Sequence, residues 1–306
     1  MSKAKIRKSG SPEVRESLGV RKSGGPEVRN SVTSSGKTEN RITRCFSDLR
    51  AAGKKAFIAY LCAGDPDLDA TVEIVVAMAE QGVDIIELGI PYSDPMADGP
   101  ANQAACERAL ASGTTVRGVL DAARRIRERT NVPLLFFTYV SPVMAYGIER
   151  FAKDAIAAGV DGLLPLDLPP EEGAEFLSTM RAAGLATICL SAPTTPPARR
   201  KMLMRESRGF LYYVCRLGVT GERATLPADL GKQVAALKRV NDVPVCIGFG
   251  ISSPEQAALA AIHGDGVIVG SHLVRLIEKH GKDKNIAQIV AARAGVLAAA
   301  VHKEHH

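Results

Sequence analysis

From residue 41 onward the chain repeats one pattern, in which a short and almost wholly apolar run is followed by an amphipathic helical stretch. Apolar runs of this length predict strands buried on both faces, as in a parallel sheet that helices cover on both sides. We predict eight such strands, at residues 56–62, 84–90, 133–139, 162–167, 186–191, 210–216, 244–250 and 266–271. We predict helices at residues 68–81, 118–130, 149–158, 171–183, 230–239, 254–263 and 286–300.

Strand and helix units of this number and length have the size of a (β/α)8 TIM barrel, an α/β fold. The rival is a doubly wound sheet, which usually carries a glycine-rich dinucleotide loop after its first strand. Here Ala63-Gly64-Asp65-Pro66 follows that strand instead. We therefore predict a barrel over residues 41–301, with the functional side chains at the carboxyl ends of its strands.

The segment 1–40 differs in composition from the rest, because it is rich in Ser, Gly, Lys and Arg and contains a near repeat at 7–17 and 21–31. With so few apolar residues it cannot offset the entropy lost on ordering, so we predict a disordered basic tail. We also expect residues 302–306 to be disordered. A transit peptide is the alternative for the tail, but its four Glu residues count against that interpretation.

The net charge of +6 comes mainly from this tail, which holds nine Lys and Arg against four Glu. The rest of the chain is nearly neutral, so we expect no nucleic-acid partner for the barrel. No run approaches the roughly 20 apolar residues of a membrane span, and the chain's start lacks the apolar core of a secretory signal. We expect no membrane partner and a cytoplasmic location, or a plastid if the tail is a transit peptide.

The cysteine and histidine residues predict no metal site, because none has the spacing of metal ligands. The six Cys all lie in strand-like or helical runs, where we expect buried free thiols. His272, just after a predicted strand, is only a loose candidate for a catalytic histidine.

Two carboxylates accompany the second predicted strand. Glu87 lies inside the apolar run, where burial raises the pKa of a carboxyl and makes it a proton carrier near neutral pH. Asp98 lies on the Pro-rich loop beyond the strand, just before Gly99 and Pro100. Each also has a purely structural interpretation, Glu87 as a paired core carboxylate and Asp98 as a turn residue. These residues alone leave both interpretations open.

Glycines at three late strand ends predict a phosphate site, because close backbone approach to an anion requires Gly and helix N-termini attract anions. They are Gly218 and Gly221, then Gly248 and Gly250, and then Gly270 beside Ser271. The alternative is that these glycines only shape tight turns.

Several segments resemble the alpha chain of tryptophan synthase. They are residues 57–66, 87–100, 216–221, 248–256 and 270–271, and the likeness spans about residues 41–300. The resemblance implies retro-aldol cleavage of indole-3-glycerol phosphate to indole and glyceraldehyde 3-phosphate, with no cofactor or metal in this chain.

The resemblance also implies roles for particular residues. Glu87 would move the protons, and Asp98 would stabilise the charge that develops at the indole ring. Thr220 would lie on a loop, shaped by Arg216 and Gly218, that closes over the substrate. The remaining contacts would be Tyr60, Tyr139, Tyr212 and Phe249 at the indole ring, and Gly221, Gly250, Gly270 and Ser271 at the phosphate.

The implied partner is the pyridoxal-phosphate beta chain of an alpha2beta2 assembly, contacted partly through residues 91–95. A free-standing indole-3-glycerol phosphate lyase is the first alternative, and a catalytically idle phosphate-binding protein with an RNA- or membrane-binding tail is the second. The chain departs from the family at Ala59, Cys62 and Cys215, where Pro, Thr and Ser are usual. The two Cys replace a hydroxyl by a weaker hydrogen-bonding thiol.

Overall fold

The computed structural model describes residues 39–214, 228–248 and 250–303. The chain divides into the units Met1–Thr38 and Glu39–His306, and all described residues belong to the second. Within them, parallel strands form one sheet in the order β5-β4-β3-β2-β1-β9-β8-β7-β6. The strands are β1 (Ala56–Cys62), β2 (Ile85–Gly89), β3 (Leu134–Thr138), β4 (Gly162–Pro165), β5 (Ala186–Thr187), β6 (Cys189–Ser191), β7 (Leu211–Val214), β8 (Val245–Gly248) and β9 (Gly266–Val269).

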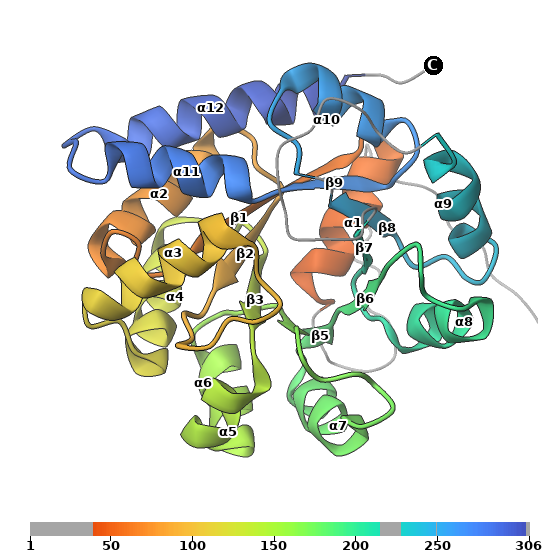
Figure 1. Cartoon of the computed structure of the whole chain (residues 1–306), viewed down its shortest axis with the longest axis horizontal. Helices are drawn as coiled ribbons and strands as arrows, with labels where there is room; N and C mark the ends of the chain where they lie inside the picture. Colours follow the sequence, from red (N-terminus) through yellow and green to blue (C-terminus); the bar gives the residue numbers. More distant parts are fainter. Residues whose placement is uncertain (1–38, 215–227, 249, 304–306) are drawn as a thin grey trace, which may run out of the picture. The chain divides into compact units, whose positions relative to one another are not determined.

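The sheet closes on itself at the chain's fifth apolar run. β5 pairs with β4 and β6 pairs with β7, yet only Ile188 separates β5 from β6. The two ends of the strand order are thus consecutive pieces of one run, which completes the barrel seen in Figure 1. The predicted TIM barrel and its eight strand regions are confirmed, with 186–191 formed as two short pieces.

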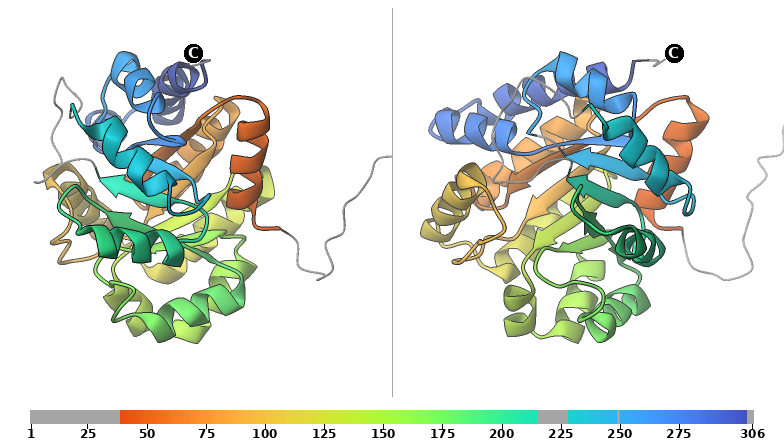
Figure 2. Two further views of the ribbon diagram at one scale, coloured as in Figure 1. Left: turned by 90° about the vertical axis from the view of Figure 1, so that its right-hand side faces the viewer. Right: turned by 45° about the vertical axis from the view of Figure 1, so that its right-hand side comes forward.

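Helices surround this barrel on the outside, as the two views in Figure 2 show. All seven predicted helical stretches form, with ends shifted by up to three residues. Helices α1, α3, α5 and α8 were not among those predicted, and α11 covers the short run after Gly270. The helices are α1 (Arg41–Ala51), α2 (Leu68–Glu80), α3 (Pro100–Ala111), α4 (Val116–Arg129), α5 (Val140–Tyr146), α6 (Ile148–Ala157), α7 (Ala174–Ala183), α8 (Pro197–Glu206), α9 (Leu230–Lys238), α10 (Pro254–Ala261), α11 (Ser271–His280) and α12 (Ile286–Val301).

Helix α1 covers the end of the barrel at which the strands begin. Its N-cap Asn40 accepts a hydrogen bond from the Ile42 backbone N–H, which starts the helix at Arg41. The buried side chains of Ile42 and Phe46 join the apolar cluster that fills the barrel interior. The opposite end, where the strands finish, carries the residues predicted to be functional.

Three aspartates link neighbouring strands by hydrogen bonds at the end of the barrel that α1 covers. Asp84, Asp161 and Asp265 each precede or begin a strand region, and each accepts a backbone N–H from the strand beside it. The carboxylates accept from the backbone N–H groups of Phe57, Leu134 and Val245, so these donors are not left unpaired. A recurring Asp before a strand is therefore part of the barrel's construction.

Two expectations about single residues need correction. Cys45 is only half-buried on α1, whereas Cys62, Cys106, Cys189 and Cys246 are buried free thiols as predicted. His302, expected in a disordered C-terminus, is the C-cap of α12, and its Nε2 lies 2.7 Å from Asp84 Oδ2. Cys215 and residues 304–306 lie outside the described residues. The boundary at residue 40 and the disorder of the tail stay predictions.

We predict that Asp161→Ala lowers the free energy of unfolding by about 3 kcal/mol, because it leaves two guanidinium groups and the Leu134 N–H without their acceptor. Asp161 is buried, and its carboxylate binds Arg41 Nη1 at 2.8 Å and Arg127 Nη2 at 3.1 Å. Urea denaturation measures this loss. The control is Glu73→Ala, which breaks an exposed pair with Arg129 and should cost much less. Equal losses in the two variants would contradict the assigned role of Asp161.

Candidate active site

Strand β2 delivers Glu87 into the barrel interior near the end where the strands finish. Glu87 pairs in register with Tyr60 of β1 and Leu135 of β3, so it is flanked by strands on both sides. Its side chain is 1% exposed, and neither carboxyl oxygen has a hydrogen-bond partner among the described residues. Burial alone raises the pKa of Glu87 to about 8, because a charged carboxylate loses its hydration there.

The surroundings of Glu87 follow from the two-residue period of the strands. Ile58 and Leu135 belong to the apolar cluster that fills the barrel below Glu87. Two residues further along the same strands come Tyr60 and Phe137, whose ring centroids lie 4.8 Å apart in an edge-on contact. Aromatic rings thus replace aliphatic side chains where the barrel opens, and Glu87 lies among them.

Asp98 is held on the loop after β2 by donors from two separate elements. The Tyr139 hydroxyl donates to Oδ2 at 2.9 Å, and Asn102 Nδ2 donates to Oδ1 at 3.2 Å. Gln103 Nε2 donates to the backbone oxygen of Asp98 at 2.9 Å and so fixes the loop itself. Tyr139 also stacks on Tyr92, with ring centroids 5.1 Å apart.

The two carboxyls differ in what sets their pKa values. For Asp98, burial raises the pKa above its ordinary value, while the hydrogen bonds from Asn102 and Tyr139 oppose that rise. Glu87 has no such donors among the described residues. Burial therefore raises the pKa of both carboxyls, and only Asp98 has donors among the described residues that offset part of the rise.

Glycines near the site make room for the tyrosine rings. A Cβ on Gly89 would lie 2.7 Å from Tyr60 Oη, and one on Gly270 would lie 3.1 Å from Tyr60 Cδ1. A Cβ on Gly248 would lie 2.5 Å from the Tyr212 hydroxyl. These glycines are required by packing, whatever else they contact.

The predicted phosphate residues flank the starts of two helices. Gly250 has φ +62°, a left-handed conformation that favours Gly, and Ser253 caps α10 through a reciprocal bond with Gln256. Gly270 is the N-cap of α11, and Ser271 is its buried first residue. The N–H groups and the dipole of a helix start favour an anion.

Several predicted residues lie outside the described residues and stay predictions. They are Thr220 and Gly221 of the predicted closing loop, and Phe249 of the predicted indole pocket. Arg216 and Gly218 lie there too. His272, the loose candidate for catalysis, accepts a hydrogen bond at 2.8 Å from Arg293 Nε of α12.

The structure also brings in residues that the sequence analysis did not single out. Asn102 contacts Asp98, and Tyr92 stacks on Tyr139. Cys106 of α3 lies beside Cys62, with 4.0 Å between their sulfur atoms, so two thiols share the position next to the site. The four-residue spacing of Asp98 and Asn102 at a helix start could have predicted that their side chains are in contact.

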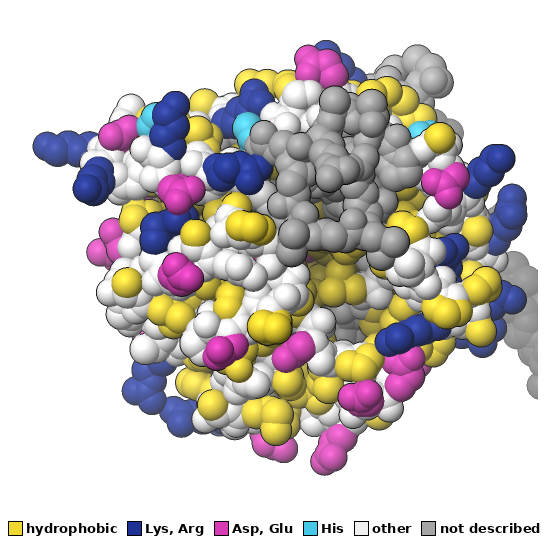
Figure 3. All heavy atoms as spheres, in the orientation of Figure 1, with side chains coloured by type: hydrophobic (Ala, Val, Ile, Leu, Met, Phe, Trp, Pro, Cys, Tyr) yellow, Lys and Arg dark blue, Asp and Glu magenta, His cyan; other side chains and the backbone are white. Residues whose placement is uncertain are grey.

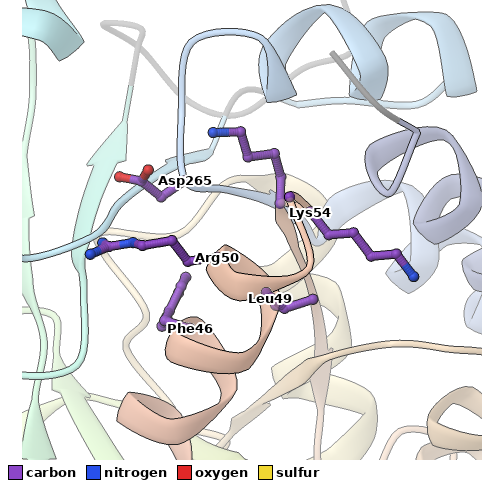
Figure 4. Close-up of a pocket in the computed structure, with 7 residues that line it drawn as sticks. Phe46, Leu49, Arg50, Lys54 and Asp265 are labelled. Carbon is purple, nitrogen blue, oxygen red and sulfur yellow. The ribbon is translucent and has the colours of Figure 1, made fainter. Parts of the chain in front are cut away.

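Figure 4 shows a cavity at the other end of the barrel, beside α1. Arg50 and Asp265 lie on its wall, and Glu87 and Asp98 do not line it. Asp265 is already bound to Lys238 Nζ at 2.7 Å and to the Val245 N–H. We assign this cavity no part in the chemistry. Its lining residues are Phe46, Leu49, Arg50, Gly53, Lys54, Lys55 and Asp265.

The described residues bear on metal binding and on membrane insertion. They contain no group of three or more His, Cys, Asp or Glu side chains placed to hold a metal ion. No helix among them is long and apolar enough to cross a membrane.

The fold is a TIM barrel, and Glu87 at one strand end has a raised pKa and no hydrogen-bond partner among the described residues. With a second carboxyl anchored on the following loop, these features are typical of an enzyme that moves protons. The family model described as "Tryptophan synthase alpha chain" matches residues 46–302. The tryptophan synthase alpha chain of Geobacter sulfurreducens is 49% identical over 240 residues, which are 78% of this chain and 91% of that protein. The alpha chain of Opitutus terrae is 46% identical over 261 residues, 85% of this chain and 98% of that protein.

Solved structures of tryptophan synthase are also similar to this chain. Mycobacterium tuberculosis tryptophan synthase matches with a TM-score of 0.80 and 39% identity, covering 87% of this chain and 100% of that chain. The alpha chain from Legionella pneumophila matches with a TM-score of 0.77 and 35% identity, covering 86% and 98%. The chain therefore belongs to the tryptophan synthase alpha chain family, and it is a lyase that cleaves indole-3-glycerol phosphate.

We predict that the free energy of unfolding falls as pH rises, relative to Glu87→Gln. The native Glu87 keeps its proton up to a pKa of about 8, whereas the unfolded side chain loses it near 4.5. The native state therefore binds more protons between these values, and stability drops across this range by a few kcal/mol.

Urea denaturation of both proteins at several pH values measures the difference. The control is Glu73→Gln, because Arg129 lowers the pKa of that exposed carboxyl, so it should add no loss between pH 5 and 8. A difference between wild type and Glu87→Gln that stays constant from about pH 4.5 to 8 would show that Glu87 is not held protonated.

Proposed function

We propose that, in the retro-aldol cleavage of indole-3-glycerol phosphate by this chain, Glu87 carries the proton and Asp98 stabilises the charged ring. The observation that supports it most is the burial of Glu87 without a partner, which raises its pKa to about 8. A carboxyl with such a pKa both gives and takes a proton near neutral pH.

A single carboxyl can carry out both proton transfers of this reaction. Protonated Glu87 gives its proton to indole C3, and the ring becomes a cationic indolenine. The resulting carboxylate then takes the proton of the glycerol hydroxyl next to the bond. Electrons from that O–H form the aldehyde, the bond to C3 breaks, and the electron pair returns to the ring as indole. Glu87 ends protonated, ready for another turnover.

Asp98 acts at the ring N–H in this proposal. The positive charge of the indolenine is shared with the ring nitrogen, so a fixed carboxylate beside it stabilises the charge as it develops. The bonds from Tyr139 and Asn102 support this role, because they hold both carboxylate oxygens in place before the reaction begins. A carboxylate that need not reorient is more effective in catalysis.

The other contacts complete the proposed site. Tyr60 and Tyr212 supply apolar surface for the indole ring, together with the ring of Tyr139, and Phe249 joins them by resemblance. Gly250, Gly270 and Ser271 hold the phosphate at the starts of α10 and α11, with Gly221 contributing from the predicted loop. Thr220 closes that loop over the substrate and excludes water.

We also propose that the chain works with a beta chain, in an alpha2beta2 assembly to which the beta chain alone brings pyridoxal phosphate. Exposed methionines support a partner at the rim of the site. Met96, on the loop after β2, is 87% exposed and Met144 of α5 is 60% exposed. Figure 3 shows hydrophobic side chains scattered over this face. The cytoplasmic location belongs to this proposal as well, with a plastid as the alternative.

The test is release of indole from indole-3-glycerol phosphate by the purified chain, with and without an added tryptophan synthase beta chain. We expect slow release that rises sharply with the beta chain. We expect Glu87→Gln to abolish release and Asp98→Asn to lower it by roughly two to four orders of magnitude. Both variants should still bind a non-cleavable indole that carries an alkyl phosphate at C3.

Each failure has a distinct meaning. Normal release by either variant would overturn its assigned role, while fast release that ignores the beta chain would indicate a free-standing lyase. No release by the wild-type chain under either condition would overturn the proposed reaction.

A further inference from the structure

Asn102 is a buried amide beside the site whose nitrogen donates a hydrogen bond and whose oxygen accepts none from the described residues. It is the third residue of α3, is 8% exposed, and donates from Nδ2 to Asp98 Oδ1 at 3.2 Å. Its Oδ1 is buried and has no partner among the described residues. Burying a carbonyl oxygen without a partner is unfavourable, so packing alone does not explain an Asn here.

The orientation of this amide follows from Asp98. A carboxylate only accepts hydrogen bonds, so the amide must present its NH2 group to it. That choice leaves the amide oxygen facing away from the one polar group that Asn102 contacts. The unpaired oxygen is thus the consequence of the donation to Asp98.

We propose that Asn102 is a positioning residue, which holds the Asp98 carboxylate charged and aimed at the ring nitrogen of the substrate. Tyr139 fixes the other oxygen, so the two donors define the plane of the carboxylate from two different elements. One donor alone would restrain a single oxygen and hold the plane of the carboxylate less tightly. This inference rests on the proposed function, because the aim of Asp98 matters only for that reaction.

The titratable neighbours of Asp98 among the described residues supply no positive charge that could replace these donors. The titratable groups that face it are Tyr60 and Cys62 of β1, Cys106 of α3 and Tyr139. Their charged forms would be anions and would repel the carboxylate. Among the described residues around Asp98, the charged form is therefore supported by neutral donors.

The test compares Asn102→Leu, which keeps the size of the side chain, with Gln103→Leu. Gln103 is the matched control because its amide holds the same loop through backbone oxygens, those of Asp98 and Pro95. We measure kcat and KM for indole release, the pH profile of kcat/KM, and the free energy of unfolding.

For Asn102→Leu we expect kcat to fall roughly ten- to hundred-fold with a much smaller change in KM. The acid limb of the pH profile should move to higher pH, since losing a donor to the charged form raises the pKa of Asp98. The free energy of unfolding should stay close to that of wild type, because the lost bond is offset by removing the unpaired carbonyl.

Gln103→Leu should leave the acid limb where it is, whatever it does to stability. If Asn102→Leu keeps both kcat and the acid limb of wild type, the inference is wrong. It is also wrong if the two variants move the acid limb equally, because both amides would then act only by holding the loop.

A direct titration of Asp98 by carbon-13 NMR of its carboxyl separates this inference from the proposed function. If the wild-type chain releases no indole, the proposed reaction fails, and the NMR midpoint still decides on Asn102. A midpoint that rises in Asn102→Leu and not in Gln103→Leu supports the positioning role. An unchanged midpoint overturns it.

Discussion

The burial of one unpaired carboxyl, that of Glu87, is the constraint on which the site depends. In water this group would be charged at neutral pH and useless as an acid. The barrel changes that, because its closed ring of parallel strands encloses an interior with few polar groups, and β2 carries Glu87 into it. The same closure that stabilises the fold therefore sets the chemistry of its most important side chain.

Asp98, further along the chain, is also buried, but its donors offset part of the rise in pKa that burial causes. It lies on a loop rather than a strand, and Tyr139 and Asn102 replace the water that burial removes. Two carboxyls of similar intrinsic acidity thus acquire different roles, one from the strand's apolar surroundings and the other from fixed donors. Neither role needs a third charged residue, and Gln103 holds the loop through its backbone.

Much of this arrangement could be predicted from the sequence. Alternating apolar and helical runs fix the barrel, and β1 begins and ends where its apolar run does. The break at Ile188 could not be foreseen, because the run 186–191 contains no Gly, Pro or charged residue to mark it and its division depends on which neighbours its two halves pair with. Helix α1 was also missed, since it packs on the barrel's end with only Ile42 and Phe46 buried.

Within the site, sequence patterns pointed to the carboxyls but not to what holds them. The tyrosines illustrate the difference. Tyr139 was predicted to contact the indole ring, and the structure adds a hydrogen bond from its hydroxyl to Asp98. Gly248 and Gly270 were predicted to approach a phosphate, and both also lie against tyrosine rings that would clash with a side chain. Contacts between segments far apart in the chain decide these points, and no local pattern reports them.

The account rests on Glu87 being protonated at neutral pH, which infrared difference spectroscopy between the wild-type chain and Glu87→Gln measures directly. The account predicts a protonated-carboxyl C=O band in the wild type at pH 7 that disappears with a midpoint at a pH of about 8. A midpoint near the ordinary value of 4.5 would contradict it, because Glu87 would then be a charged carboxylate in the working enzyme.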